Sequence, residues 1–160
     1  AKSGKINELI LNQALDNFEG NLNSSLDIKD FDVSFARGLS LEDGASTITN
    51  FTAEIITTSL KNLLDKNKYD LNNHLFPKFI ICGGGRKNKY LMDLLSVKIS
   101  KKIGYKKFQL IDEHNVDGDF IESEAFAFLA IRSFLNLPIS FPNTTGCKEP
   151  CTGGVMVKNY

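Results

Sequence analysis

The sequence of 160 residues lacks an excess of charge of either sign, because 19 lysine and arginine residues balance 19 aspartate and glutamate residues. A protein whose main partner is nucleic acid or an anionic membrane carries a basic surface, so this balance argues against both partners. No apolar run approaches the roughly 20 residues of a transmembrane helix, and the first residues show no signal peptide. We therefore expect a soluble, cytoplasmic protein.

Cysteine and histidine are also scarce, and their spacing predicts no metal site. The three cysteines lack CxxC spacing, and His74 and His114 stand in polar segments that indicate the surface. Cys82 ends an apolar run and is expected to be a small buried residue. Cys147 and Cys151 lie in a stretch with glycine and proline, where pairing and metal binding stay open and free thiols are favoured.

Hydrophobic periodicity predicts alternating helices and strands in a chain whose length suits one domain. Ser40 and Asp43 have the spacing of a helix start, with a hydroxyl at the cap and a carboxylate three residues later. The connections are long enough for parallel pairing, so the expected fold is a layered α/β domain with a small sheet. The expected helices cover 6–18, 40–66, 88–101 and 119–135, the expected strands cover 78–82 and 107–111, and a terminal strand at 155–157 stays open.

The apolar run from Phe79 to Cys82 is followed directly by Gly83, Gly84 and Gly85, and a helical pattern begins after Asn88. A strand, a glycine turn and a helix start let bare backbone approach a phosphate, because residues without Cβ permit positive φ angles and close contact. An ordinary turn without a ligand explains the glycines equally well. The stretch by itself leaves a nucleotide site and an empty turn both open.

Four carboxylates surround the start of the last predicted helix, those of Asp117, Asp119, Glu122 and Glu124. Asp119 and Glu122 have the spacing of a capping box, which would give both a structural role. Glu122 and Glu124 cannot share a helix face, so we expect one to face solvent and the other the cleft or core. The apolar run 125–130 is expected to be buried. A carboxylate at this position, beside a phosphate-type turn, is a reasonable hydroxyl-binding group.

These motifs, in this order, resemble those of the anhydro-N-acetylmuramic acid kinases, members of the sugar kinase and actin-like ATPase superfamily. The most specific are GGGRKN at 83–88 and VDGDFIE at 116–122, followed by AFAFLA at 125–130. Further matching stretches are SGKINELIL at 3–11, DFDVSF at 30–35, LSLEDGASTITNFTAEIITTSL at 39–60 and LPISFPNTTGCKEP at 137–150.

The resemblance implies that Gly83, Gly84 and Gly85 line ATP, that Asn88 stands at the head of the next helix beside it, and that Glu122 contacts the sugar. It implies ATP with Mg²⁺ as cofactors and a small sugar as substrate. The implied reaction converts 1,6-anhydro-N-acetylmuramic acid to N-acetylmuramic acid 6-phosphate, with water opening the anhydro bridge, in peptidoglycan recycling. A homodimer stays open.

The resemblance also implies a ribonuclease-H-like, actin-like ATPase fold, of which this chain is the C-terminal half. Residues 1–39 would form a substrate-side helix and connection, and residues 40–160 the nucleotide-binding core. The superfamily's first phosphate loop, an Asp-Gly-Thr turn, does not occur in the sequence, nor does an initiator methionine. We therefore expect a piece of a longer protein, with the N-terminal domain and the catalytic aspartate outside it and no catalytic residue within it.

Two stretches depart from the family pattern. Residues 24–29 replace a Lys-Ser-Thr-Gly-Arg-Glu-like stretch and lack its arginine, which leaves a substrate role for that loop open. Residues 147–151 also differ from the usual closing segment.

Two other functions compete with this reading. The first is another sugar kinase or ATPase of the superfamily, against which the motif around Glu122 argues. The second is a non-catalytic binding module, which would show no affinity for nucleotide even with the missing half supplied. A dinucleotide-binding fold is disfavoured, because the glycines lack GxGxxG spacing.

Overall fold

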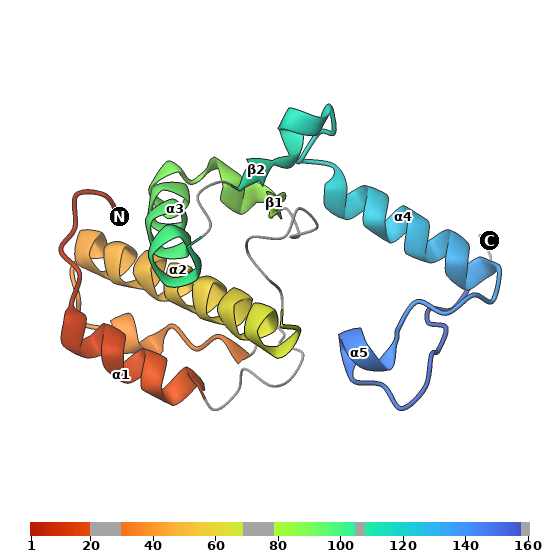
Figure 1. The fold of residues 1–160 in the computed structure, drawn as a ribbon, viewed down its shortest axis with the longest axis horizontal. Helices are drawn as coiled ribbons and strands as arrows, with labels where there is room; N and C mark the ends of the chain where they lie inside the picture. Colours follow the sequence, from red (N-terminus) through yellow and green to blue (C-terminus); the bar gives the residue numbers. More distant parts are fainter. Residues whose placement is uncertain (20–29, 69–78, 105–107, 158–160) are drawn as a thin grey trace.

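The computed structural model describes residues 1–19, 30–68, 79–104 and 108–157. Three long helices form the body of the molecule: α1 at Glu8–Glu19, α2 at Leu41–Lys66 and α3 at Lys89–Ile103. α2 is the longest and packs against both of the others (Figure 1). The expected helices at 6–18, 40–66 and 88–101 are confirmed, with ends that differ by two residues or fewer.

The start of α2 is held by its own cap and by the N-terminal segment. The Ser40 hydroxyl oxygen accepts a hydrogen bond from the Asp43 N–H at 3.1 Å, which confirms the predicted cap. The Asp43 carboxylate in turn accepts from the Lys5 N–H at 2.7 Å. At Gly4 a Cβ atom would lie 1.9 Å from the Glu42 carbonyl oxygen, so only glycine allows the two backbones to approach this closely.

Apolar residues of α1 and α2 form the first core cluster. Phe51 lies at its centre, with its ring edge-on to Phe18 at 5.7 Å between centroids and tilted against Phe35 at 4.9 Å. The short 3₁₀ helix η2, Ser34–Ala36, supplies Phe35. The buried members are Leu11, Ala14, Phe18, Phe51 and Ile55.

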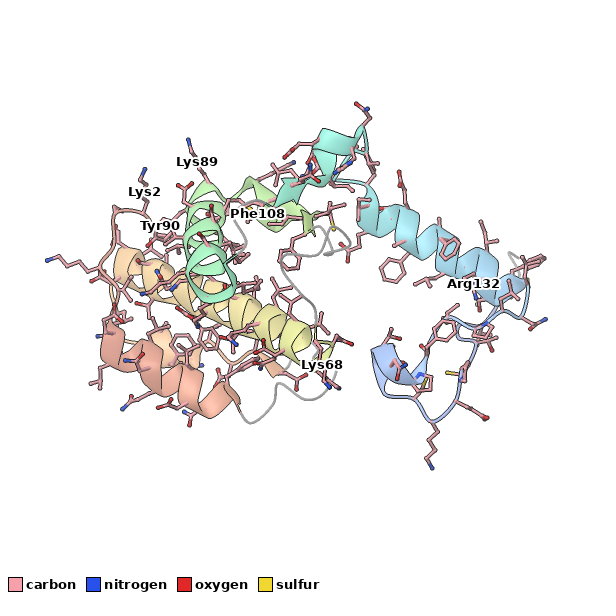
Figure 2. The ribbon with its side chains drawn as sticks, in the orientation of Figure 1. Lys2, Lys68, Lys89, Tyr90, Phe108 and Arg132 are labelled. Atoms are coloured by element: carbon pink, nitrogen blue, oxygen red, sulfur yellow. The ribbon has the colours of Figure 1, made fainter. Side chains whose placement is uncertain are left out.

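A second cluster joins α2 to α3 beneath the sheet strands. Its buried members are Ala53, Leu64, Leu95, Ile99 and Ile103. Beside it, α2 buries a seam of small polar residues, Ser46, Thr47, Asn50 and Thr57. The Thr47 and Thr57 hydroxyl groups donate back to carbonyls of the preceding turn, that of Thr57 to Ala53 at 2.7 Å. Asn50 of this seam donates to the hydroxyl of Tyr90 of α3 at 3.2 Å; Tyr90 is labelled in Figure 2. Tertiary packing therefore holds a helix whose many threonines give it low intrinsic propensity.

The sheet consists of two short parallel strands, β1 at Ile80–Ile81 and β2 at Gln109–Leu110. Ile80 pairs with Gln109 and Ile81 with Leu110, so the predicted parallel pairing is confirmed. The outer ends of both predicted strands, at residues 78 and 107, lie outside the described residues. The fold is thus a mostly helical α/β arrangement with a small parallel sheet.

Cys82 is exposed, and the prediction that it is buried is wrong. The residue comes directly after β1, where the chain leaves the sheet for the glycine turn, and nothing in the described ranges buries it. Cys147 and Cys151 are free thiols, as expected. His114 is exposed, also as expected, whereas His74 and residues 24–29 lie outside the described residues.

The fourth long helix, α4 at Ile121–Phe134, confirms the predicted helix but not its burial. In Figure 1, α4 extends away from the body formed by α1, α2 and α3. None of its residues is buried, and Phe126 and Phe128 are 65% and 59% exposed. The prediction that residues 125–130 are buried is therefore wrong, because no described helix of the body packs along this one.

The C-terminal segment folds back toward α4. It contains the short helix α5, Pro142–Thr145, and an isolated antiparallel bridge between Ser140 and Cys151. Together with α4 it borders an apolar groove of about 660 Å³. Residues 155–157 form no strand here and stay exposed. None of the helices in the described ranges is long and apolar enough to cross a membrane.

Candidate functional site

The glycine turn begins directly after β1 and runs into the 3₁₀ helix η3, Gly84–Lys87, which leads to α3. Gly83 has φ 78° and ψ 174°, a backbone conformation that residues with a side chain rarely adopt. Gly84 and Gly85 have ordinary negative φ angles, so the conformational need for glycine is confined to Gly83. A Cβ atom at Gly83 or Gly84 would meet nothing within 4 Å, so this side of the turn is open.

Two backbone donors of the turn have no partner among the described residues. Within the part of the chain that the structure describes, no hydrogen bond takes the N–H groups of Gly84 and Gly85. Such groups at the start of a helical turn carry partial positive charge and attract anions. Asn88 is exposed and caps α3, since its side-chain oxygen accepts from the Leu91 N–H at 3.2 Å. The turn can therefore offer two N–H groups to a phosphate without rearranging.

Arg86 is the buried centre of the site, with its side chain 6% exposed. Its guanidinium binds Asp112 through two hydrogen bonds, from Nε at 2.7 Å and from Nη2 at 3.0 Å. Nη1 donates to the Asp119 carboxylate at 2.7 Å and to the Gly83 carbonyl at 3.1 Å. Lys87 adds an ion pair with Asp119 at 2.5 Å. One side chain thus joins the glycine turn to the segment that precedes α4.

The ion pairs shift the acidity of both carboxylates. Hydrogen bonds from Arg86 lower the pKa of Asp112 to about 2. Hydrogen bonds from Lys87 and then from Arg86 lower the pKa of Asp119. The same contacts with Asp112 and Asp119 raise the pKa of the Arg86 guanidinium. Arg86 and the two carboxylates are therefore all held in their charged forms at neutral pH.

Asp119 does not cap α4, so the capping-box prediction is wrong. The residue at the helix start is Phe120, which makes no side-chain cap bond. The Asp119 carboxylate is held by Arg86 and Lys87 instead, because charge-assisted bonds to two cations outweigh one bond to a backbone N–H. Its backbone N–H donates to the Asp117 carboxylate at 2.9 Å, which shapes the turn.

Gly118 has a structural role that the sequence did not suggest. The residue is buried, and a Cβ atom there would lie 2.5 Å from Nε and 2.6 Å from Cζ of Arg86. A side chain at this position would therefore displace the guanidinium from its place between its two aspartates. The VDGD motif contained the signal, but its partner stands 32 residues earlier, at a distance that no local pattern reveals.

Glu122 lies in the first turn of α4 and is exposed. Glu124 is exposed as well, so the expectation that one of the two faces a cleft or core is not met in the described residues. Glu122 stands three residues after Asp119 and is connected through it to the glycine turn. Among the described residues, no group of three or more metal-ligating side chains lies close enough to hold an ion.

Comparison with known proteins decides the family. The model of the family "Anhydro-N-acetylmuramic acid kinase" matches residues 21–159. The chain belongs to this family. A curated anhydro-N-acetylmuramic acid kinase from Pelagibacter ubique is 52% identical over 160 residues, which is 98% of this chain and 40% of the relative. The relatives of the same name from Zymomonas mobilis and Rhizorhabdus wittichii are 40% and 38% identical, over 81% and 97% of this chain and 32% and 39% of their own.

The chain spans about two fifths of the length of the curated anhydro-N-acetylmuramic acid kinases it matches. The resemblance of the motifs to this family is thus confirmed. The matched residues 21–159 include both the glycine turn and the motif around Glu122, but the match assigns no role to either. The roles of Gly83, Gly84, Gly85, Asn88 and Glu122 stay predictions.

Proposed function

We propose that this chain is the C-terminal part of an ATP-dependent kinase that converts 1,6-anhydro-N-acetylmuramic acid to N-acetylmuramic acid 6-phosphate, with water opening the anhydro bridge. The observation that carries the nucleotide role is the glycine turn after β1, with its open face and two unpaired N–H groups. The family supplies the substrate, because its relatives are named for it. The reaction would be a cytoplasmic step of peptidoglycan recycling.

In this proposal the backbone of Gly83, Gly84 and Gly85 lines the ATP phosphates, and Asn88 orders the helix start beside them. Mg²⁺ bound together with ATP would supply positive charge that offsets the charge of the phosphates. Glu122 accepts a hydrogen bond from a hydroxyl group of the sugar. The fold would be one half of an actin-like ATPase, whose other half brings the catalytic aspartate and closes the cleft. Phosphoryl transfer depends on such positioning, so neither half would suffice alone.

The nucleotide role can be tested by replacing Gly84 with valine in the full-length enzyme. A Cβ atom at Gly84 meets no neighbour, so the fold should stay intact, while the branched side chain would block the open face of the turn. We expect ATP affinity, measured by calorimetry, to fall at least about tenfold, equal to roughly 1.4 kcal/mol. Unchanged affinity with an unchanged melting temperature would contradict the assignment.

The substrate role needs a separate comparison of sugars. The full-length enzyme should transfer phosphate from ATP to the anhydro-sugar and to no other member of a panel of hexoses and amino sugars. Transfer to a different sugar would favour another kinase of the superfamily. Absence of ATP binding by the full-length enzyme would favour the non-catalytic binding module.

A further inference from the structure

Arg86 contacts both walls of the proposed site with one side chain. Its four hydrogen bonds end on three separate segments: Gly83 in the glycine turn, Asp112 in the 3₁₀ helix η4 (Ile111–His114), and Asp119 before α4. The first segment would contact ATP, and the last leads within three residues to Glu122. The sequence separations of 26 and 33 residues to the two aspartates show that this is a tertiary link.

The geometry argues against Arg86 as a phosphate ligand. An arginine beside a glycine turn is the obvious candidate for such a contact, because guanidinium groups bind phosphate well. Here four of the five N–H donors are already engaged, and the side chain is 6% exposed. Lys87 is engaged by Asp119 as well. Arg86 can therefore act on bound substrates only through the groups that it holds in place.

One of those groups is the peptide between Gly83 and Gly84. In a planar trans peptide the C=O and N–H bonds point in opposite directions. The Gly83 carbonyl points at Nη1 of Arg86, so the unpaired Gly84 N–H points away from the guanidinium. A peptide flanked by two glycines meets little steric resistance to rotation. The backbone N–H of Arg86 also donates to the Gly83 carbonyl, at 3.3 Å, so the side-chain bond adds a second restraint on the orientation in which the Gly84 N–H is available to an anion.

We infer that Arg86 is a positioning residue, which fixes the Gly83–Gly84 peptide and the start of α4 relative to each other. This inference rests on the proposed function, since it assigns the two ends of the link to ATP and to the sugar. Through it, the phosphate donor and the hydroxyl-binding carboxylate of Glu122 keep a constant separation. Gly118 takes part indirectly, by leaving the space in which the guanidinium lies.

Two variants of the full-length enzyme test the link from different sides. Arg86→Lys keeps the charge but loses the planar fork that binds Asp112 through two bonds. Gly118→Ala leaves Arg86 itself unchanged and forces its guanidinium to move, because the added Cβ would lie 2.5 Å from Nε. The matched control is Lys98→Gln, which removes an ion pair with Glu54 between α3 and α2 and lies ten residues beyond Asn88 along α3.

Two measurements are made on each variant. In steady-state kinetics, we expect both site variants to lose roughly 10²-fold in kcat/KM, for ATP and for the anhydro-sugar alike, because small misplacements have effects of this size. Hydrogen exchange without substrates should speed up in residues 83–88 and 112–122 of both variants. Lys98→Gln should lower the melting temperature and leave the kinetics and the exchange of these two segments unchanged.

The two measurements separate this inference from the proposed function. If the wild-type enzyme transfers no phosphate to the anhydro-sugar, the proposed function fails, while the exchange data still decide whether Arg86 links the two segments. If Arg86→Lys keeps the kinetics of the wild type, or if exchange accelerates in only one of the two segments, the positioning role is overturned. A melting temperature lowered equally in Arg86→Lys and Lys98→Gln, with normal kinetics in both, would show a purely structural ion pair.

Discussion

The helices α2 and α4 differ in composition and in burial. α2 has the smaller share of large apolar residues, yet it is the helix that is packed into the core. α2 carries many threonines, yet Phe51, Ala53 and Ile55 are buried between α1 and α3. α4 is richer in phenylalanine, leucine and isoleucine, and none of its residues is buried. Apolar composition therefore indicates that a helix has something to bury. Composition does not indicate which other segment covers the apolar residues, and among the described residues no helix of the body covers those of α4.

The difference has a consequence for function. The body around α2 and α3 supports the glycine turn through the second core cluster, against which the partly buried Ile81 and Leu91 pack. Glu122, on the exposed helix α4, is tied to the body by the ion pairs of Arg86 and not by apolar packing. The proposed ATP wall is thus supported by a core, whereas the proposed sugar wall is supported by charge.

The largest effect is expected when residues 1–160 are tested for activity without the rest of the enzyme. Residues 1–160 purified alone should fold, since the body buries two apolar clusters. They should bind ATP weakly and transfer no phosphate to the anhydro-sugar, because the proposed catalytic aspartate and the opposite wall of the cleft are not among them. A coupled ADP assay on the purified chain, with a host-enzyme blank, would measure this. Turnover above the blank would contradict the assignment of half an active site.

Paired truncations would measure the packing difference directly. Phe51 is 4% exposed, so Phe51→Ala should lower the free energy of unfolding of residues 1–160 by about 3–5 kcal/mol. Phe128, at 59% exposed, is the matched control, and Phe128→Ala should change it by less than about 0.5 kcal/mol. Urea denaturation followed by circular dichroism gives both values. Equal losses would mean that α4 is packed in solution.

The proposed role of the sugar wall can be tested at Glu122. Glu122→Gln in the full-length enzyme should weaken transition-state binding of the sugar by roughly 2–4 kcal/mol and spare ATP binding, if the carboxylate bonds a hydroxyl. A residue that only stabilises the first turn of the helix would instead lower stability by roughly 0.5–2 kcal/mol and leave the kinetics unchanged. Kinetics measured beside urea melts separate the two. Glu124→Gln, in the same turn, is the matched control.

The smallest effect is expected in the melting temperature at acidic pH. Because the pKa of Asp112 is lowered to about 2 in the folded protein from an ordinary value of 3.8, its ionised form is favoured by folding. The stabilisation is present above the ordinary value and is lost as the pH falls through about 2. Melting temperatures measured between pH 5 and pH 2 should therefore decrease less in Asp112→Asn than in the wild type. Parallel curves for the two proteins would show that this ion pair adds no acid-sensitive stability.

Local patterns in the sequence were sufficient to predict most of the secondary structure and the family of this protein. The Ser40 cap, the helix spans and the strand–turn–helix order around the glycines all depend on neighbouring residues, so they were predicted correctly. The family was also identifiable, because its motifs are short and ordered along the chain. The positive φ angle was expected somewhere in the three glycines, and the structure assigns it to Gly83 alone.

Which distant groups meet depends on the tertiary fold and not on local sequence patterns. Asp119 had the spacing of a cap, yet it pairs with Arg86 and Lys87, because the parallel strands bring their two loops to the same edge of the sheet. The need for glycine at position 118 likewise arises only in the folded chain, where the guanidinium of Arg86 lies against it. The exposure of α4 likewise depends on whether another layer is present. Pair contacts and burial are properties of the assembled chain, whereas caps, turns and periodicity act within a few residues of each other.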